Sequence, residues 1–269
     1  MGDNVILEGD GSDACSFLNC NNLKKVTMGE NIQILGGNYS NYLLKNDNNL
    51  EEVTIKSLSN IIGNCALYGA GSALKGEIKI NEGVTSIGLD AFKDCTYLYM
   101  CFLPSTVDTI ACNPFTGCKN LNEIRIASDN NGYYVSNGAV ISSRFRTLCC
   151  YPPAKSDTSY TIPNKVESID LEAFCGCNNL KELIFPDSVT KIDRWAICDC
   201  KNLEKVILSE NLESIGECGI IGCNNLKSIK IPKSVTSIGY SALGCYSSNW
   251  NPMSDFTIYG TRGTEAERY

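Results

Sequence analysis

The fold is decided by three consecutive stretches, "AFCGCNNLKELIFPDSVTKID" (173–193), "AICDCKNLEKVILSENLESIG" (196–216) and "GIIGCNNLKSIKIPKSVTSIG" (219–239). Each stretch begins 23 residues after the one before it and keeps the same order of apolar and polar positions. A fixed period in the twenties is typical of a solenoid, in which one supersecondary unit stacks many times. The sequence therefore predicts one elongated repeat array rather than a globule with a catalytic cleft.

Within each repeat, the apolar residues occupy two short segments that we predict to be strands. In the first stretch, Leu183 and Phe185 lie two positions apart, as one face of a strand requires, and Pro186 closes the segment because it lacks an N–H. Val189 and Ile192 form a second apolar pair. A single repeat cannot bury these residues alone. We therefore expect neighbouring repeats to bury them on one another and to join their strands into long parallel sheets.

Six cysteines repeat with nearly the same period, and we interpret them as a structural ladder. In a solenoid, such cysteines lie beneath a turn, where a free thiol behaves as a small hydrophobe. Disulfides, or a zinc ion held by the pairs Cys175/Cys177 and Cys198/Cys200, are the alternatives, although C-x-C differs from the C-x-x-C spacing of zinc knuckles. The ladder consists of Cys95, Cys118, Cys177, Cys200, Cys223 and Cys245.

Composition narrows the possible functions. The chain has 269 residues, a formal net charge of −7 and no histidine. Its acidic surface repels phosphate backbones, and no apolar run approaches the length of a membrane span, so we expect neither nucleic-acid binding nor membrane insertion. Histidine is the side chain most used for acid–base catalysis near neutral pH and the commonest metal ligand. We therefore expect no enzymatic activity, no cofactor and no metal site.

The stretch "NLKSIKIPKSVTSIG" (225–239) resembles the repeat of the BspA-type, or Treponema-type, leucine-rich repeat proteins, which are found on bacterial and some protozoan surfaces. The resemblance is close from 72 to 245 and looser from 15 to 71. It implies a β-rich repeat solenoid with repeats of about 23 residues. The implied architecture is a curved, right-handed superhelix with a parallel β-sheet on its concave side and short strands and turns on its convex side.

The resemblance also implies a function. We expect a non-catalytic protein–protein interaction module of adhesion type that binds a host or matrix protein through its concave face. The alternative is a structural spacer that presents other domains of a longer parent protein. The resemblance implies an extracellular or cell-surface protein. The first ten residues, "MGDNVILEGD", contain no signal peptide, so we expect the leader to lie outside this chain, with a cytoplasmic location left open. The partner is unidentified, and a monomer is favoured.

We expect one continuous solenoid domain with five segments. The interval from Cys118 to Cys177 is 59 residues, which is one period of 23 plus 36. The additional residues include "YYVSNGAVIS" around Asn137-Gly138, which is a strong signal for a β-hairpin. The predicted segments are degenerate N-terminal repeats or a cap (1–71), regular repeats (72–126), an inserted hairpin (127–161), regular repeats (162–245) and a C-terminal capping element (246–269).

One strand of the expected concave face differs from its neighbours. In "YLYMCFLP" (97–104), Met100 and Phe102 take the two outward positions, which the repeats before and after fill with charges. Exposed apolar residues beside an acidic surface can mark a partner site. The candidate partner-binding residues are Tyr99, Met100, Phe102, Glu123, Arg125, Glu182 and Ile184.

A second interpretation of the same strand needs no partner. The inserted segment is rich in aromatic residues and could fold over Met100 and Phe102 as a cover. The aromatic residues that would do so are Tyr133, Tyr134, Phe145 and Tyr151. Trp195 falls in a turn on the convex side, where we expect it to pack rather than to recognise a ligand.

Overall fold

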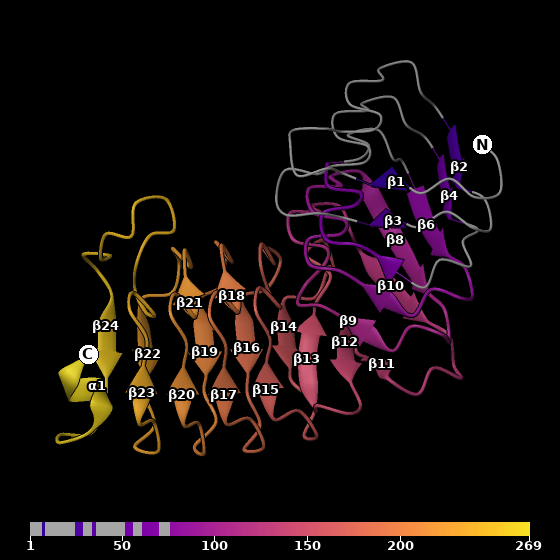
Figure 1. The fold of residues 1–269 in the computed structure, drawn as a ribbon. Coiled ribbons are helices and arrows are strands. Elements are labelled where there is room, and N and C mark those ends of the chain that lie inside the picture. The colour runs from indigo at the N-terminus through magenta and orange to yellow at the C-terminus, as the bar shows by residue number, and fades with distance from the viewer. Residues whose placement is uncertain (1–6, 9–24, 29–33, 36–51, 56–60, 70–75) are drawn as a thin grey trace. The chain divides into compact units, whose positions relative to one another are not determined.

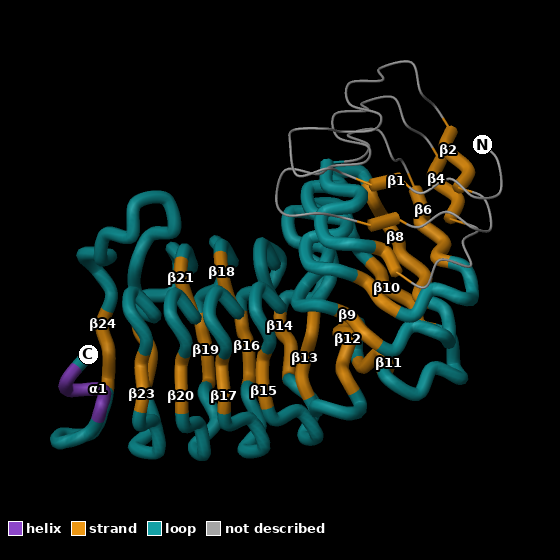
Figure 2. Tube along the Cα trace, viewed as in Figure 1, coloured by secondary structure: helices purple, strands orange, loops and turns teal. Residues whose placement is uncertain are grey.

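The computed structural model describes residues 7–8, 25–28, 34–35, 52–55, 61–69 and 76–269. The chain divides into two compact units, Met1–Ser143 and Arg144–Tyr269, and each is described by itself. In both units, short strands join neighbouring coils of the chain in parallel sheets (Figure 1). The one helix in the described ranges lies at the C-terminus (Figure 2). The predicted β-rich repeat solenoid is therefore confirmed.

The first unit contains two parallel sheets, which we call its long-strand and short-strand sheets. Consecutive strands of each sheet come from consecutive coils, so each sheet follows the stacking direction. The long-strand sheet consists of β2 (Lys25–Met28), β4 (Glu52–Ile55), β6 (Gly76–Ile80), β8 (Leu98–Leu103) and β10 (Glu123–Ile126). The short-strand sheet consists of β1 (Leu7–Glu8), β3 (Ile34–Leu35), β5 (Ile61–Ile62), β7 (Ser86–Ile87) and β9 (Thr109–Ile110).

The second unit repeats this plan. Its long strands are β14 (Ser159–Thr161), β16 (Glu182–Ile184) and β19 (Lys205–Ile207), with β22 (Ser228–Lys230) paired to β24 (Thr257–Tyr259). The strands that correspond to the short-strand sheet of the first unit are β13 (Thr147–Cys150), β15 (Ser168–Ile169), β17 (Lys191–Ile192), β20 (Ser214–Ile215) and β23 (Ser237–Ile238). A third pair joins β18 (Ile197–Cys198) to β21 (Ile220–Ile221). The helix α1 (Glu265–Arg268) follows the last strand.

The apolar positions that define the repeat form the core of each unit. In the first unit, Ile78, Cys101 and Ile124 are opposite one another on β6, β8 and β10, and none is more than 2% exposed. The side chains between them point to the other face, because successive residues of a strand alternate. Each coil thus buries its apolar residues on the next coil, as the period predicts.

Aromatic residues pack against one another in each core. Phe92 and Phe115 stack in the first unit, with ring centroids 5.2 Å apart. In the second unit, Tyr151, Tyr160 and Phe174 form a buried cluster with centroid separations of 4.7 to 5.9 Å. Offset and tilted ring pairs of this kind stabilise a core beyond the burial of their area.

The segment 127–161, expected as a single insertion, has two different parts. Its first part is an antiparallel hairpin in the first unit, formed by β11 (Tyr133–Ser136) and β12 (Ala139–Ser142). Asn137 and Gly138 form the turn with φ angles of 48° and 94°, as a two-residue turn with positive φ at both positions requires.

The second part belongs to the second unit and forms one further coil of the solenoid. There β13 pairs with β15, and β14 pairs with β16, all in parallel. The N–H of Tyr151 donates to the carbonyl of Ala173 at 2.8 Å, just as Phe174 donates to Ala196 in the next coil at 2.8 Å. Tyr151 therefore occupies the position of Phe174. Ala154, 23 residues before Cys177, takes the place that a cysteine has in the coils of the ladder, which explains why the sequence pattern does not reveal this coil.

Most of the predicted degenerate segment 1–71 lies outside the described residues. Its described strands nevertheless pair in register. Val26 is opposite Val53, and Thr54 is opposite Lys79, so the coils there are 27 and 25 residues long. The stretched spacing therefore extends the same sheets rather than ending them.

At Gly216, the backbones of two neighbouring coils lie so close together that a side chain has no room. A Cβ at this position would lie 2.5 Å from the backbone nitrogen of Arg194 and 2.7 Å from the carbonyl carbon of Asp193. Backbone atoms cannot rotate away, so we expect Gly216→Ala to lower the free energy of unfolding by about 1–3 kcal/mol. Gly132→Ala is the control because its Cβ would meet its nearest neighbour at 3.5 Å. Chemical denaturation followed by circular dichroism compares the two, and equal stabilities would contradict the close approach.

Candidate protein-binding face

The candidate site lies on the outward face of the long-strand sheet in the first unit. Met100 on β8 is opposite Glu77 on β6 and Glu123 on β10. Phe102 is likewise opposite Lys79 and Arg125. Parallel pairing in register therefore places two apolar side chains of β8 between two flanking pairs of charged residues.

Four side chains of one coil form what we call the β8 patch: Tyr97, Tyr99, Met100 and Phe102. Tyr97 is 44% exposed and Tyr99 54%, whereas Met100 and Phe102 are half-buried. The pairing of β6 with β8 shifts by one residue between Gly76 and Glu77, so Tyr99 lies between the residues that pair. An irregularity of this kind re-aims a side chain, and here both Tyr99 and Met100 reach the outward face.

Two of the four charges beside the β8 patch, Glu123 and Arg125, are paired with each other. The Nε atom of Arg125 donates to Glu123 at 2.8 Å, and a second guanidinium nitrogen donates to its other carboxylate oxygen at 3.0 Å. Both residues are well exposed, and this hydrogen bonding raises the pKa of Arg125 further. The pair gives the border of the patch one fixed donor group and one fixed acceptor group with no net charge.

The contacts of the hairpin bear on its expected role as a cover. The Tyr133 hydroxyl accepts a hydrogen bond from the N–H of Ile110 on β9 at 2.8 Å, which attaches the hairpin to the short-strand sheet. Asn130, which precedes the hairpin, donates to the carbonyl of Val107 at 2.8 Å and to that of Pro104, directly after β8, at 2.9 Å. Tyr151 lies in the core of the second unit, and Phe145 there is 65% exposed.

Glu182 and Ile184, the last two candidates, lie on β16 of the second unit. Lys205 on the neighbouring β19 contacts Glu182 at 2.7 Å, and the Ser159 hydroxyl donates to the same carboxylate at 3.2 Å. The hydrogen bond with Lys205 lowers the pKa of Glu182. Ile184 is opposite Ile207, which is 40% exposed. The structure thus groups the seven candidates as five residues in the first unit and two in the second.

The periodic cysteines connect successive coils through their thiols. Five of the six ladder thiols donate to a main-chain carbonyl of the preceding coil, whereas Cys245 donates to the carbonyl of Leu243 in its own coil at 3.5 Å, and all six cysteines are buried. Every cysteine that the structure describes is a free thiol. The donor–acceptor pairs are Cys95 to Leu67 (3.1 Å), Cys118 to Phe92 (3.0 Å), Cys177 to Tyr151 (3.8 Å), Cys200 to Phe174 (2.8 Å) and Cys223 to Ile197 (3.7 Å).

Burial suppresses the chemistry of three thiols, Cys101 on β8 and the ladder thiols Cys118 and Cys177. It raises their pKa above the ordinary value, because the thiolate would be desolvated, whereas hydrogen bonding with the Cys177 and Cys223 thiols lowers the pKa of Cys200. The thiolate is the form that attacks electrophiles and binds metals, so the three groups with a raised pKa are poor nucleophiles. Among the described residues, no group of three or more cysteines and carboxylates is placed to hold a metal ion.

The sequence model for the BspA type leucine rich repeat region matches residues 38–148 and 149–258, with six copies of the repeat. The chain belongs to the BspA-type leucine-rich repeat family. The coils described above are therefore leucine-rich repeats of this type, and the long-strand face that carries the β8 patch is the strand face of these repeats. No curated protein sequence gives a significant match.

Solved structures resemble this BspA-type chain in fold. A leucine rich cell surface protein from Faecalibacterium prausnitzii A2-165 is 20% identical over 91% of this chain and 84% of its own, with a TM-score of 0.61. The pneumococcal vaccine antigen PcpA is 17% identical over 91% of this chain and 75% of its own, with a TM-score of 0.55. Within the described residues, no helix is both long and apolar enough to cross a bilayer.

Proposed function

We propose that this chain is a non-catalytic protein-binding module of a cell-surface or secreted protein, and that the β8 patch is its main contact with the partner. The observation that carries the proposal is the exposure of Tyr97 and Tyr99 beside Met100 and Phe102 on an otherwise charged strand face. Burying aromatic side chains gives large stabilisation, so leaving them in water within a folded unit favours a role in binding.

The surroundings of the patch match the anatomy of protein interfaces. Binding energy usually concentrates in a few aromatic and arginine residues at the centre of a contact, with polar groups around them. Here the aromatic residues are central, and the Glu123–Arg125 pair lies at the border. The parallel ladder holds all of these side chains on a rigid backbone, so little conformational entropy is lost when a partner binds.

The surface location rests on the family and its relatives. One similar structure is described as a cell surface protein and another as a vaccine antigen, which suits a protein exposed to a host. Together with the β8 patch, this supports adhesion to a host or matrix protein. Glu182 and Ile184 are proposed as a second, weaker contact in the second unit.

The test uses protein-coated beads and a panel of purified extracellular-matrix proteins and cultured cells. We expect Met100→Asp combined with Phe102→Asp to weaken attachment by about 30-fold or more, because hot-spot residues contribute about 2 kcal/mol or more. Val135→Asp is the matched control, since Val135 lies in the same unit, is apolar and is 37% exposed. Ile184→Asp tests the second contact separately, with an expected loss of about threefold.

Attachment that is equal for the wild type and the double variant would place the partner elsewhere and contradict the patch assignment. The absence of wild-type attachment to every matrix protein and cell type would contradict the adhesion proposal and favour a structural spacer. Circular dichroism of the variants shows whether a loss of binding reflects a loss of folding.

A further inference from the structure

Both tryptophans of the chain meet at the C-terminal end of the second unit. Trp195 and Trp250 pack edge to face, with ring centroids 6.0 Å apart and planes at 66°. Tyr240 packs on Trp250 at 6.3 Å and 58°. The three rings come from three separate parts of the sequence: the turn before β18, the residues after β23, and the loop before β24. We call them the aromatic triad.

Trp195 is half-buried against the core, but the other two rings of the triad are more exposed than packing alone explains. Tyr240 is 70% exposed and Trp250 44%, although rings of this size stabilise a fold most when they are buried. Trp195 and Trp250 also have φ angles of 57° and 59°, a region that bulky residues rarely adopt. The corresponding turns of neighbouring coils place Glu172, Cys218 and Ser241 at this position, so the repeat itself does not require tryptophan.

A cavity of about 770 Å³ adjoins two rings of the triad, which is within the range of small-molecule sites. Tyr240, Trp250, Met253 and Phe256 form its apolar wall.

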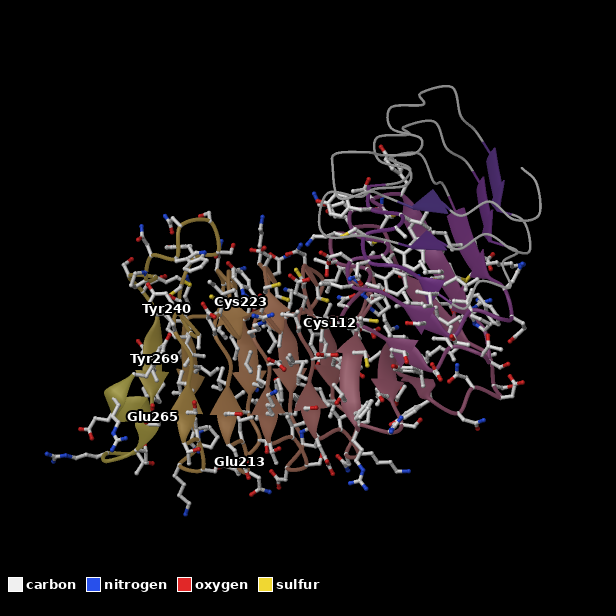
Figure 3. All side chains as sticks on the ribbon, viewed as in Figure 1. Cys112, Glu213, Cys223, Tyr240, Glu265 and Tyr269 are labelled. Carbon is white, nitrogen blue, oxygen red and sulfur yellow. The ribbon has the colours of Figure 1, made fainter. Side chains whose placement is uncertain are left out.

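A second wall is polar. It comes from α1 and carries the carboxylate of Glu265 and the guanidinium of Arg268, which are paired at 3.5 Å. Tyr269 fixes the end of this wall, because its hydroxyl accepts a hydrogen bond from the N–H of Leu243 at 3.0 Å. Figure 3 shows Tyr240, Tyr269 and Glu265 at the C-terminal end of the second unit.

The chemistry of the two walls selects the ligand. An anionic ligand would meet Glu265 in a chain with a net charge of −7, and a cationic ligand would meet Arg268. A neutral sugar ring uses both walls. Its C–H groups carry partial positive charge that suits the electron-rich face of Trp250 or Tyr240, and its hydroxyls both donate and accept hydrogen bonds, as Glu265 and Arg268 require.

We propose that the cavity at the C-terminal end of the second unit is a binding site for a neutral saccharide. The site is independent of the β8 patch, which lies in the first unit. Either proposal can therefore fail while the other stands.

Intrinsic fluorescence tests this proposal directly, because every tryptophan of the chain belongs to the triad. The full chain is titrated with chitotriose, mannotriose and maltotriose. We expect at least one of them to shift the emission to shorter wavelength in a saturable way, with Kd in the range of about 0.1–10 mM. Isothermal titration calorimetry gives the same Kd without relying on tryptophan.

Variants locate the site. We expect Trp250→Ala and Tyr240→Ala each to weaken saccharide binding about tenfold or more. The large exposure of Tyr240 makes its loss compatible with folding even if Trp250→Ala unfolds. Tyr259→Ala is the matched control because Tyr259 is 59% exposed in the same unit but does not line the cavity.

Three results would each overturn the proposal. The first is no saturable response to any of the three saccharides up to about 10 mM. The second is unchanged binding by Tyr240→Ala, or an equal loss in Tyr259→Ala. The third is equally tight binding of an anionic trimer of galacturonic acid, which would contradict the selection for a neutral ligand.

Discussion

Replacing Phe174 with alanine is expected to lower the free energy of unfolding of the second unit by about 3–5 kcal/mol. The Phe174 ring is fully buried and contacts Tyr151 and Tyr160, with centroids 5.5 and 5.9 Å away. Tyr151 and Tyr160 come from the coil that precedes the coil of Phe174, so a cavity at Phe174 removes ring contacts between two neighbouring coils. The cost then includes the lost burial and the cavity that the neighbours cannot fill.

Tryptophan fluorescence in a denaturant series measures this loss, because Trp195 and Trp250 both report on the second unit. Phe145→Ala is the control. Phe145 is 65% exposed, so its loss is expected to change stability by about 0.5 kcal/mol or less. A loss of less than about 1 kcal/mol in Phe174→Ala would show that the coils do not share a common core.

Stability is also expected to fall steeply in alkaline solution, because the buried thiols resist ionisation. In the folded chain, burial raises the pKa of Cys101, Cys118 and Cys177 above the value of 9.0 that an unperturbed thiol has. In the unfolded chain, these thiols ionise near 9.0, so above that pH the unfolded state binds fewer protons than the folded state. Below pH 9, these thiols therefore leave the free energy of unfolding unchanged. They lower it progressively as the pH rises above 9.

The expected size follows from the linkage relation. Between about pH 8 and about pH 10, the Cys101 thiol lowers the free energy of unfolding by about 1.4 kcal/mol. Denaturant unfolding at both pH values measures the total. Cys101→Val removes one thiol from a buried strand position, and we expect it to reduce the pH dependence by about 1.4 kcal/mol. An unchanged pH dependence in this variant would contradict the assignment.

The sequence predicts the architecture because the apolar positions of each repeat can be buried only when the repeats stack on one another. Leu183 and Ile192 lie at fixed positions of a 23-residue phrase, and stacking leaves only one way to bury both. The hairpin is predictable for a similar reason, since Asn137-Gly138 fits a turn with positive φ. The coil that contains Tyr151 is hidden because it has lost the cysteine and the spacing, while the backbone hydrogen bonds that define the coil need neither.

The candidate sites are less accessible from the sequence. Met100 and Phe102 are visible as apolar residues in positions that neighbouring repeats fill with charges. The Arg125–Glu123 pair, in contrast, depends on side-chain geometry within one strand. For Trp195, the sequence predicts only packing. No sequence signal brings Tyr240 and Trp250 together with it, because the loop before β24 folds back across repeats without a periodic pattern. The one available clue was that the chain has two tryptophans.

Hydroxyl-radical footprinting, read by mass spectrometry, tests the central claim most directly, because tyrosine, methionine and phenylalanine are readily oxidised when solvent reaches them. The chain is oxidised alone and when saturated with the matrix protein that binds it best in the bead assay. We expect the partner to protect Tyr99, Met100 and Phe102 from oxidation. Tyr259, which is 59% exposed in the second unit, is expected to stay as reactive as before. Equal oxidation of the β8 patch with and without bound partner would contradict the proposal that this patch is the binding site.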